Sequence, residues 1–174
     1  MPDTPRYLVR AAELQAQPEF VFHHPLNPRS AIAFRQQDGK TLSELTGLTR
    51  LGVHLCRILP GKEGFAYHRH YREEEWVFVL SGRGIAEIGD EEFEIGPGDF
   101  LGYPAGGAAH HLKNPHAEDL VCLMGGERCS VEVADFPRDG KRLLRDGQKE
   151  QLVNVADLQP LFPAGDEGTD PQAR

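Results

Sequence analysis

Two histidines separated by a single residue, His68 and His70, are the first side chains in this 174-residue chain whose spacing suggests shared chemistry. Side chains at positions i and i+2 of a β-strand leave the same face, so a strand here points both imidazoles in one direction. Glu75 follows shortly after, and His110 lies much further along the chain. A histidine pair alone is weak evidence, but a pair joined by a carboxylate and a distant histidine, each framed by glycines, predicts a metal site.

The predicted metal ligands are His68, His70, Glu75 and His110. Three imidazoles and one carboxylate around a divalent ion have a net charge of about +1 and suit Fe, Mn, Ni, Cu or Zn rather than Ca or Mg. We therefore expect one divalent transition metal per chain. Four ligands on a six-coordinate ion leave two positions for water, substrate or oxygen, whereas zinc also accepts four-coordination. The motif contains no thiolate, so ligand softness does not choose among these metals.

The short segment 71–74 separates the histidine pair from Glu75. His68 and Glu75 have opposite parity in the chain, so this segment must turn or bulge if both are to face one ion. We expect Glu75 to open a strand over 76–80 that runs antiparallel to the first and faces the histidines across the ladder. The charged side chains of the turn are expected to be solvated; they are Arg72, Glu73 and Glu74.

His111 stands next to His110, and adjacent strand residues point to opposite faces, so only one of the two is a ligand. Strand alternation places Lys113 on the same face as His111. A lysine ammonium beside a divalent cation is repelled and desolvated. This favours His110 as the metal ligand, and His111 is the alternative.

Short apolar runs punctuated by glycine or proline turns follow one another from residue 48 onward. A spacing of about 8 to 12 residues is typical of an all-β sandwich or barrel, and the lack of long helical periodicity favours antiparallel pairing. The predicted strands cover 52–59, 65–70, 75–80, 85–88, 92–95, 100–103, 108–113 and 120–124. We divide one domain into an N-terminal arm with edge strands (1–47), a barrel core (48–127) and a C-terminal extension (128–174). That extension contains a short helix over 153–161 and a polar tail over 165–174.

These motifs resemble those of the cupin superfamily, in particular its small single-domain bacterial members of unsettled activity. The motif G(x)5-6HxH(x)3-4E(x)6G is matched by Gly61, His68, His70, Glu75 and Gly82. The motif G(x)5PxG(x)2H(x)3N is matched by Gly98, Pro104, Gly106, His110 and Asn114, with three residues rather than two before the histidine. The resemblance covers roughly residues 48–127. It implies an antiparallel β-barrel, that is, a double-stranded β-helix of the jelly-roll type, and the same four metal ligands.

The amino-acid composition limits the kinds of molecule that the protein is expected to bind. The chain has 19 basic and 27 acidic side chains and a formal charge of −8, which argues against nucleic acid or an anionic membrane. It has no apolar run of membrane-spanning length and no signal-peptide pattern at its start, so we expect a cytoplasmic protein. The three cysteines form no CxxC pair; Cys56 and Cys122 lie in apolar runs and are expected in the core.

The resemblance and the site together predict a metal-dependent enzyme acting on a small organic molecule, by dioxygenase or by isomerase or lyase chemistry. The alternatives are a non-enzymatic barrel that binds or senses a small ligand, and a structural staple. A polar group such as Arg57 or Tyr103 near an open metal position would favour the enzyme. His54 and Arg57 fall on opposite strand faces, so at most one looks inward. Both faces of 76–80 are apolar, and with the resemblance this predicts a homodimer.

Overall fold

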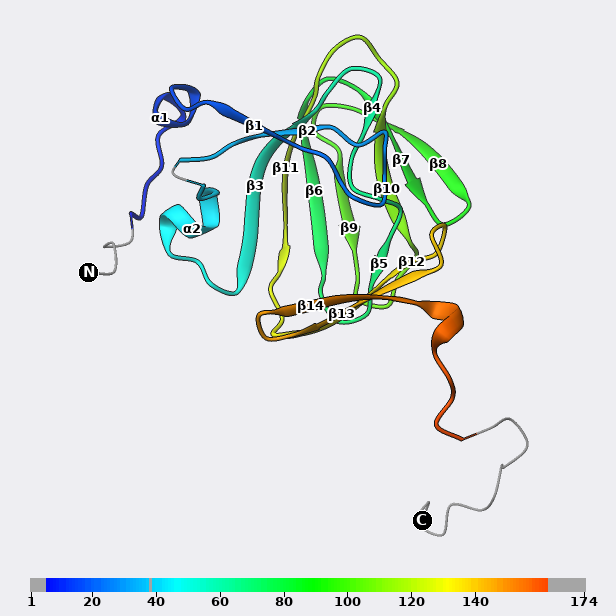
Figure 1. The fold of residues 1–174 in the computed structure, drawn as a ribbon. Helices are drawn as coiled ribbons and strands as arrows, with labels where there is room; N and C mark the ends of the chain where they lie inside the picture. The colour runs from blue at the N-terminus through cyan, green and yellow to red at the C-terminus, as the bar shows by residue number, and fades with distance from the viewer. Residues whose placement is uncertain (1–5, 38, 163–174) are drawn as a thin grey trace.

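Antiparallel strands build the protein, and the computed structural model arranges them in three sheets (Figure 1). The structure describes residues 6–37 and 39–162. The large sheet has the order β1 (Glu19–Phe22), β2 (Ile32–Arg35), β3 (Leu51–Ile58), β11 (Leu120–Glu127), β6 (Glu75–Ser81) and β9 (Phe100–Tyr103). The second sheet has the order β4 (Lys62–Glu63), β10 (His110–Asn114), β7 (Gly84–Ile88) and β8 (Glu91–Ile95). The third has the order β14 (Lys149–Asn154), β13 (Lys141–Asp146), β12 (Val131–Phe136) and β5 (Arg69–His70).

Helices are short and peripheral in the described part of the chain. They are α1 (Ala11–Gln15), α2 (Leu42–Thr46) and the 3-10 turn η1 (Val155–Asp157). A capping box starts α2, in which the Glu44 carboxylate accepts a hydrogen bond from the Thr41 backbone amide at 2.8 Å. The helix ends at Gly47, whose φ of +77° is the left-handed conformation that glycine adopts without strain. None of the described helices is long and apolar enough to cross a membrane.

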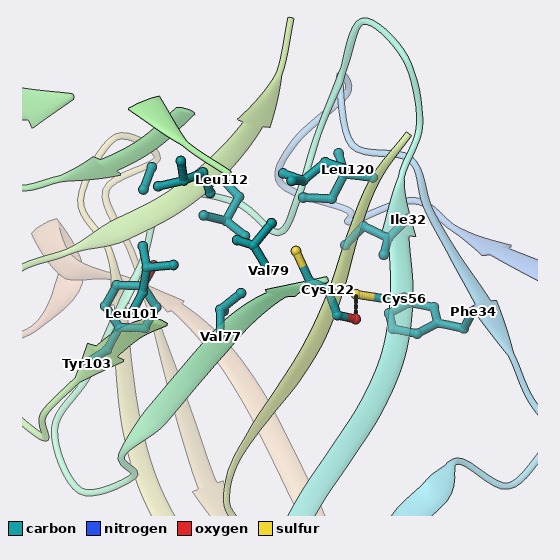
Figure 2. Close-up of a cluster of buried hydrophobic side chains, with 13 residues drawn as sticks. Ile32, Phe34, Cys56, Val77, Val79, Leu101, Tyr103, Leu112, Leu120 and Cys122 are labelled. Atoms are coloured by element: carbon teal, nitrogen blue, oxygen red, sulfur yellow. Dashed lines mark hydrogen bonds between the residues drawn. The ribbon is translucent and has the colours of Figure 1, made fainter. Parts of the chain in front are cut away.

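The hydrophobic core lies between the large sheet and the second sheet (Figure 2). Ile58, Val79 and Leu120 of the large sheet are fully buried, and Leu112 of β10 packs against this cluster. The prediction that Cys56 and Cys122 lie in the core is confirmed, since both are buried, and the Cys56 thiol donates to the Cys122 carbonyl at 3.7 Å. On β6 and β9, alternation places every second side chain in the core, namely Val77 and Val79 on β6 and Leu101 and Tyr103 on β9.

The predicted all-β, antiparallel fold is confirmed, and the described strands form a sandwich of the jelly-roll kind rather than a closed barrel. Within the predicted strand 65–70 only Arg69–His70 forms regular strand. The helix expected over 153–161 is limited to η1, because β14 extends to Asn154. The tail over 165–174 lies outside the described residues.

The third sheet is the main feature that the sequence did not predict. Its strands β12, β13 and β14 form consecutive antiparallel hairpins in a segment expected to be a polar extension. Charged residues occupy both faces of these strands, for example Arg142 and Arg145 on β13. This sheet has few fully buried side chains, so its strands do not alternate between apolar and polar residues. The sequence of this segment therefore looks like that of a loop.

Candidate metal centre

All four predicted ligands meet at one point. The Oε2 atom of Glu75 lies 3.4 Å from His68 Nε2 and 3.5 Å from His70 Nε2. It lies 3.3 Å from His110 Nε2. Ligand atoms roughly 2.1 Å from an ion are about 3.4 Å apart at the vertices of a tetrahedron and about 3.0 Å apart in an octahedron. The separations from Glu75 therefore match the spacing of donors around a transition metal, and the ligand atoms of His68, His70 and Glu75 all lie within 4.8 Å of one another.

Three of the candidate ligands belong to three different sheets, and the fourth, His68, directly precedes β5. His70 belongs to β5 of the third sheet, Glu75 opens β6 of the large sheet, and His110 opens β10 of the second sheet. His68 and His110 face each other through a pair of backbone hydrogen bonds of 3.1 and 2.7 Å. The expected ladder between the histidine strand and the Glu75 strand is wrong, because β5 pairs with β12 while β6 pairs with β9 and β11. Glu75 reaches the histidines across the junction of the sheets.

Two imidazoles are held in a defined tautomer. The Nδ1 atom of His68 is 2.7 Å from the carbonyl of Ala66, and that of His110 is 3.2 Å from the carbonyl of Ala108. A carbonyl only accepts hydrogen bonds, so each Nδ1 carries the proton and each Nε2 presents a lone pair. Lone pairs directed at a carboxylate oxygen repel it unless a cation or extra protons lie between them. The donor set therefore fits a bound metal ion.

The third imidazole, His70, has acidic neighbours instead. Its Nδ1 lies 3.6 Å from a carboxylate oxygen of Glu73 and 3.6 Å from one of Glu132, and it makes no hydrogen bond within the described structure. Burial lowers the pKa of His70 by more than the negative charges of Glu75 and Glu132 raise it, so the ring is neutral at pH 7. Burial alone would raise the pKa of Glu75, but in the metal-free protein hydrogen bonds from His110 and His68, which exist only while their Nε2 atoms are also protonated, hold it well below its usual range. Both groups thus have the protonation state that a metal requires.

The prediction of a solvated turn before Glu75 is confirmed for Arg72 and Glu74, which are exposed, and is wrong for Glu73. Glu73 is buried and accepts hydrogen bonds from the Cys129 amide at 2.7 Å and from Arg145 at 2.6 Å. Glu132 is 0% exposed and accepts from the Tyr71 amide at 3.0 Å and from the Glu73 amide at 2.9 Å. No sequence signal identified Glu132, because on β12 the glutamate is buried while its neighbour Val131 is exposed.

The register argued from the sequence agrees with the positions of the two adjacent histidines. His110 points to Glu75, whereas His111 Nε2 lies 2.9 Å from Glu87, on the other side of β10. Lys113 also contacts Glu87, at 2.6 Å, away from the cluster.

A cavity of about 180 Å³ adjoins the cluster and is lined by His68, Glu75 and His110 on one side. Tyr103 lines it too, with its ring parallel to that of His110 at 3.5 Å between centroids. The Tyr103 hydroxyl is buried and has no hydrogen-bond partner in the described structure. Burial and the charge of Glu75 raise the pKa of this phenol, so it stays protonated.

Of the other two polar candidates, one faces the cavity. His54 lines it, whereas Arg57 points away and forms ion pairs with Glu19 and Asp119. The prediction that at most one of them looks inward is confirmed. Tyr103, rather than Arg57, is the polar group placed beside the cluster.

A comparison with known protein families finds a match to the family described as Cupin domain. The match covers residues 54–126. A proposed sugar phosphate isomerase from Acidithiobacillus ferrooxidans is 39% identical, with a TM-score of 0.83 and coverage of 90% of this chain and 97% of that chain. A cupin superfamily protein from Silicibacter pomeroyi, named as a sugar phosphate isomerase, is 23% identical with a TM-score of 0.70. The match covers 84% of this chain and 91% of that chain, and at this identity it shows a similar fold alone. An uncharacterized protein from Methanocaldococcus jannaschii is 34% identical over 59 residues, which are 34% of this chain and 42% of that protein.

Proposed function

Because the chain belongs to the cupin superfamily, we propose that it is a metal-dependent isomerase acting on a small sugar phosphate, with the ion held by the three histidines and the glutamate of the centre. The observation that carries the proposal is the convergence of three imidazole Nε2 atoms on Glu75 Oε2 at the wall of a cavity. The substrate class is supported by the relative from Acidithiobacillus ferrooxidans, whose similarity extends over 90% of this chain.

Isomerisation of a sugar moves a proton between neighbouring carbons and needs neither an oxidant nor a reductant. When bound, the ion supplies a Lewis acid that polarises a carbonyl or hydroxyl oxygen of the substrate. Tyr103 provides a protonated phenol next to His110, with a hydroxyl free to donate a hydrogen bond to a substrate oxygen. A hydrogen-bond donor placed beside the ion favours catalysis over simple ligand binding. Dioxygenase chemistry and non-enzymatic binding are the alternatives that the experiment below distinguishes.

The first measurement is the metal content of protein purified without a metal-affinity tag, by elemental analysis, for wild type and Glu75→Ala. We expect about one divalent transition-metal ion per chain in wild type and a large loss in the variant. Small sugar phosphates are then incubated with the loaded protein in D2O, and isomerisation is followed by NMR through deuterium incorporation. Unchanged metal content in the variant contradicts the site, and absence of isomerisation with every metal contradicts the activity.

Tyr103→Phe tests the proposed hydrogen-bond donor. We expect it to retain the metal and to isomerise the substrate more slowly by roughly a hundredfold, the lower range for loss of a general acid. Leu101→Val, at a buried core position on the same strand, is the matched control and should retain activity. Equal rates in the Tyr103→Phe variant and wild type contradict the role of the phenol.

A further inference from the structure

One imidazole of the centre lacks a partner for the nitrogen that faces away from Glu75. The Nδ1 atoms of His68 and His110 contact backbone carbonyls, whereas His70 Nδ1 is buried and has no hydrogen-bond partner among the described residues. A neutral imidazole carries a single proton, so a ring that ligates through Nε2 keeps this proton on Nδ1. A buried N–H group without an acceptor is unfavourable. The centre therefore needs an acceptor behind His70.

Two carboxylates lie behind this nitrogen, and they differ in the oxygen that they offer. Glu73 Oε2 and Glu132 Oε1 are each 3.6 Å from His70 Nδ1. Glu132 Oε1 already accepts hydrogen bonds from the amides of Tyr71 at 3.0 Å and Arg72 at 3.3 Å. Within the described part of the chain, the hydrogen bonds to Glu73 all end on its Oε1 atom. A carboxylate oxygen has two lone pairs, so Glu132 Oε1 is filled while Glu73 Oε2 is open.

The C-terminal sheet holds the Glu73 side chain by its other oxygen. Glu73 is 5% exposed, and its Oε1 atom accepts hydrogen bonds from the Cys129 amide at 2.7 Å and from Arg145 Nη1 at 2.6 Å. Arg145 lies on β13 and is fixed in turn by Glu150, which accepts a hydrogen bond from its Nε at 2.8 Å. Because Oε1 is held by two donors, Oε2 stays on the side of His70.

We propose that Glu73 is a positioning residue of the metal centre, which accepts the Nδ1 proton of His70 and so keeps the Nε2 lone pair directed at the ion. The separation of 3.6 Å is longer than a hydrogen bond of about 2.7 to 3.2 Å, and a side-chain shift of less than about 1 Å closes it. A carboxylate in this place makes the imidazole a stronger ligand. The inference rests on the metal centre of the proposed function and is independent of the substrate and the reaction.

Glu73→Gln tests the proposal with a side chain of the same shape. The Cys129 amide and Arg145 both donate to Oε1, so the glutamine oxygen takes that position and its NH2 group takes the position of Oε2. The NH2 group then faces His70 Nδ1, and two donors oppose each other when Nδ1 is protonated. We expect the variant to bind Zn²⁺ at least tenfold more weakly than wild type, measured in competition with a chromophoric chelator.

Glu74→Gln is the matched control, because it makes the same change of charge at the next residue. The Glu74 side chain is exposed and makes no hydrogen bond or ion pair within the described structure, so this variant should bind Zn²⁺ like wild type. Thermal unfolding of the metal-free proteins verifies that both variants fold. Equal Zn²⁺ affinities of wild type and Glu73→Gln overturn this inference alone, whereas a wild type that binds no ion overturns the metal centre and the inference together.

A measurement on wild type separates the proposed hydrogen bond from a purely structural role of Glu73. In the Zn²⁺-loaded protein, the Nδ1 protons of the three imidazoles are followed by 1H–15N NMR. We expect the proton of His70 to resonate downfield of those of His68 and His110, because its acceptor is a carboxylate and theirs are carbonyls. A His70 proton that resonates at or upfield of the other two, or that exchanges with water too fast to be seen while theirs are visible, overturns the proposal.

Discussion

The tautomers of the imidazoles define the centre at the level of single residues. Backbone carbonyls of Ala66 and Ala108 accept from the Nδ1 atoms of His68 and His110, so their Nε2 lone pairs are directed inward. His70 instead places Nδ1 near two carboxylates. A carboxylate behind a ligating histidine raises the basicity of the ring, and His70 is therefore the candidate ligand most open to tuning by its surroundings.

The choice between the adjacent histidines can be tested directly. We expect His110→Ala to lose most of its bound metal, because His110 is part of the ring around Glu75, and His111→Ala to retain it, because His111 contacts Glu87 on the other side of β10. The measurement is metal content after exposure to equimolar Zn²⁺ and removal of the excess. Loss confined to the His111 variant would show that the register of β10 is wrong.

At the level of elements, the third sheet positions the histidine strand. Its strand β12 pairs with β5, which carries His70, and Glu132 on β12 accepts backbone amides of the turn that follows. On the opposite face of β12, Asp135 accepts hydrogen bonds from Arg142 at 2.7 Å and from Tyr71 at 2.7 Å. These carboxylates connect the C-terminal strands to the metal centre.

Asp135 should make the stability of this sheet dependent on pH. Hydrogen bonds from Arg142, with Tyr71 and Arg69, lower its pKa from 3.8 to about 2, a shift worth about 2 kcal/mol at neutral pH. The stabilisation is complete above the unfolded pKa and is lost as the pH falls through the folded pKa. Urea unfolding should therefore show Asp135→Asn to be less stable than wild type at pH 7, and the difference should shrink by roughly half at pH 3. The exposed Asp146→Asn is the control, and a difference that does not change with pH contradicts the assignment.

On the scale of the whole molecule, a row of apolar side chains crosses the outer face of the large sheet, beside the ion-paired Arg57. Leu55, Leu123, Phe78 and Phe100 stand opposite one another on adjacent strands. Phe78 is 36% exposed and Phe100 66%. Rows of exposed apolar side chains on a sheet are typical of surfaces that bind another protein.

We expect this face to form the interface of a homodimer. Light scattering at micromolar concentration should give the mass of a dimer for wild type and of a monomer for a Phe78→Ser, Phe100→Ser double variant, because the substitutions remove apolar area from the contact. Phe93→Ser, at an exposed position on β8 of the second sheet, should remain dimeric. A monomeric wild type would contradict the prediction.

Most of the strands between residues 51 and 127 could be predicted from the sequence, because turns marked by glycine and proline and the two-residue period are local properties. The four candidate ligands were also predicted, since their spacing within each segment is local. The third sheet could not be predicted, because Glu132 and Asp135 are buried by partners from distant segments and not by an apolar pattern.

Only the tertiary structure decided how the ligands meet. The sequence by itself determined that His68, His70, Glu75 and His110 are present with the spacing of a metal motif, and that His110 and His111 leave opposite faces. Strand pairing was decided by the packing of whole sheets, which set β5 against β12 and β6 against β11. Packing between distant segments also placed Tyr103 against His110, and Arg145 against Glu73. Contacts of this kind depend on the path of the whole chain, and no local pattern of residues records them.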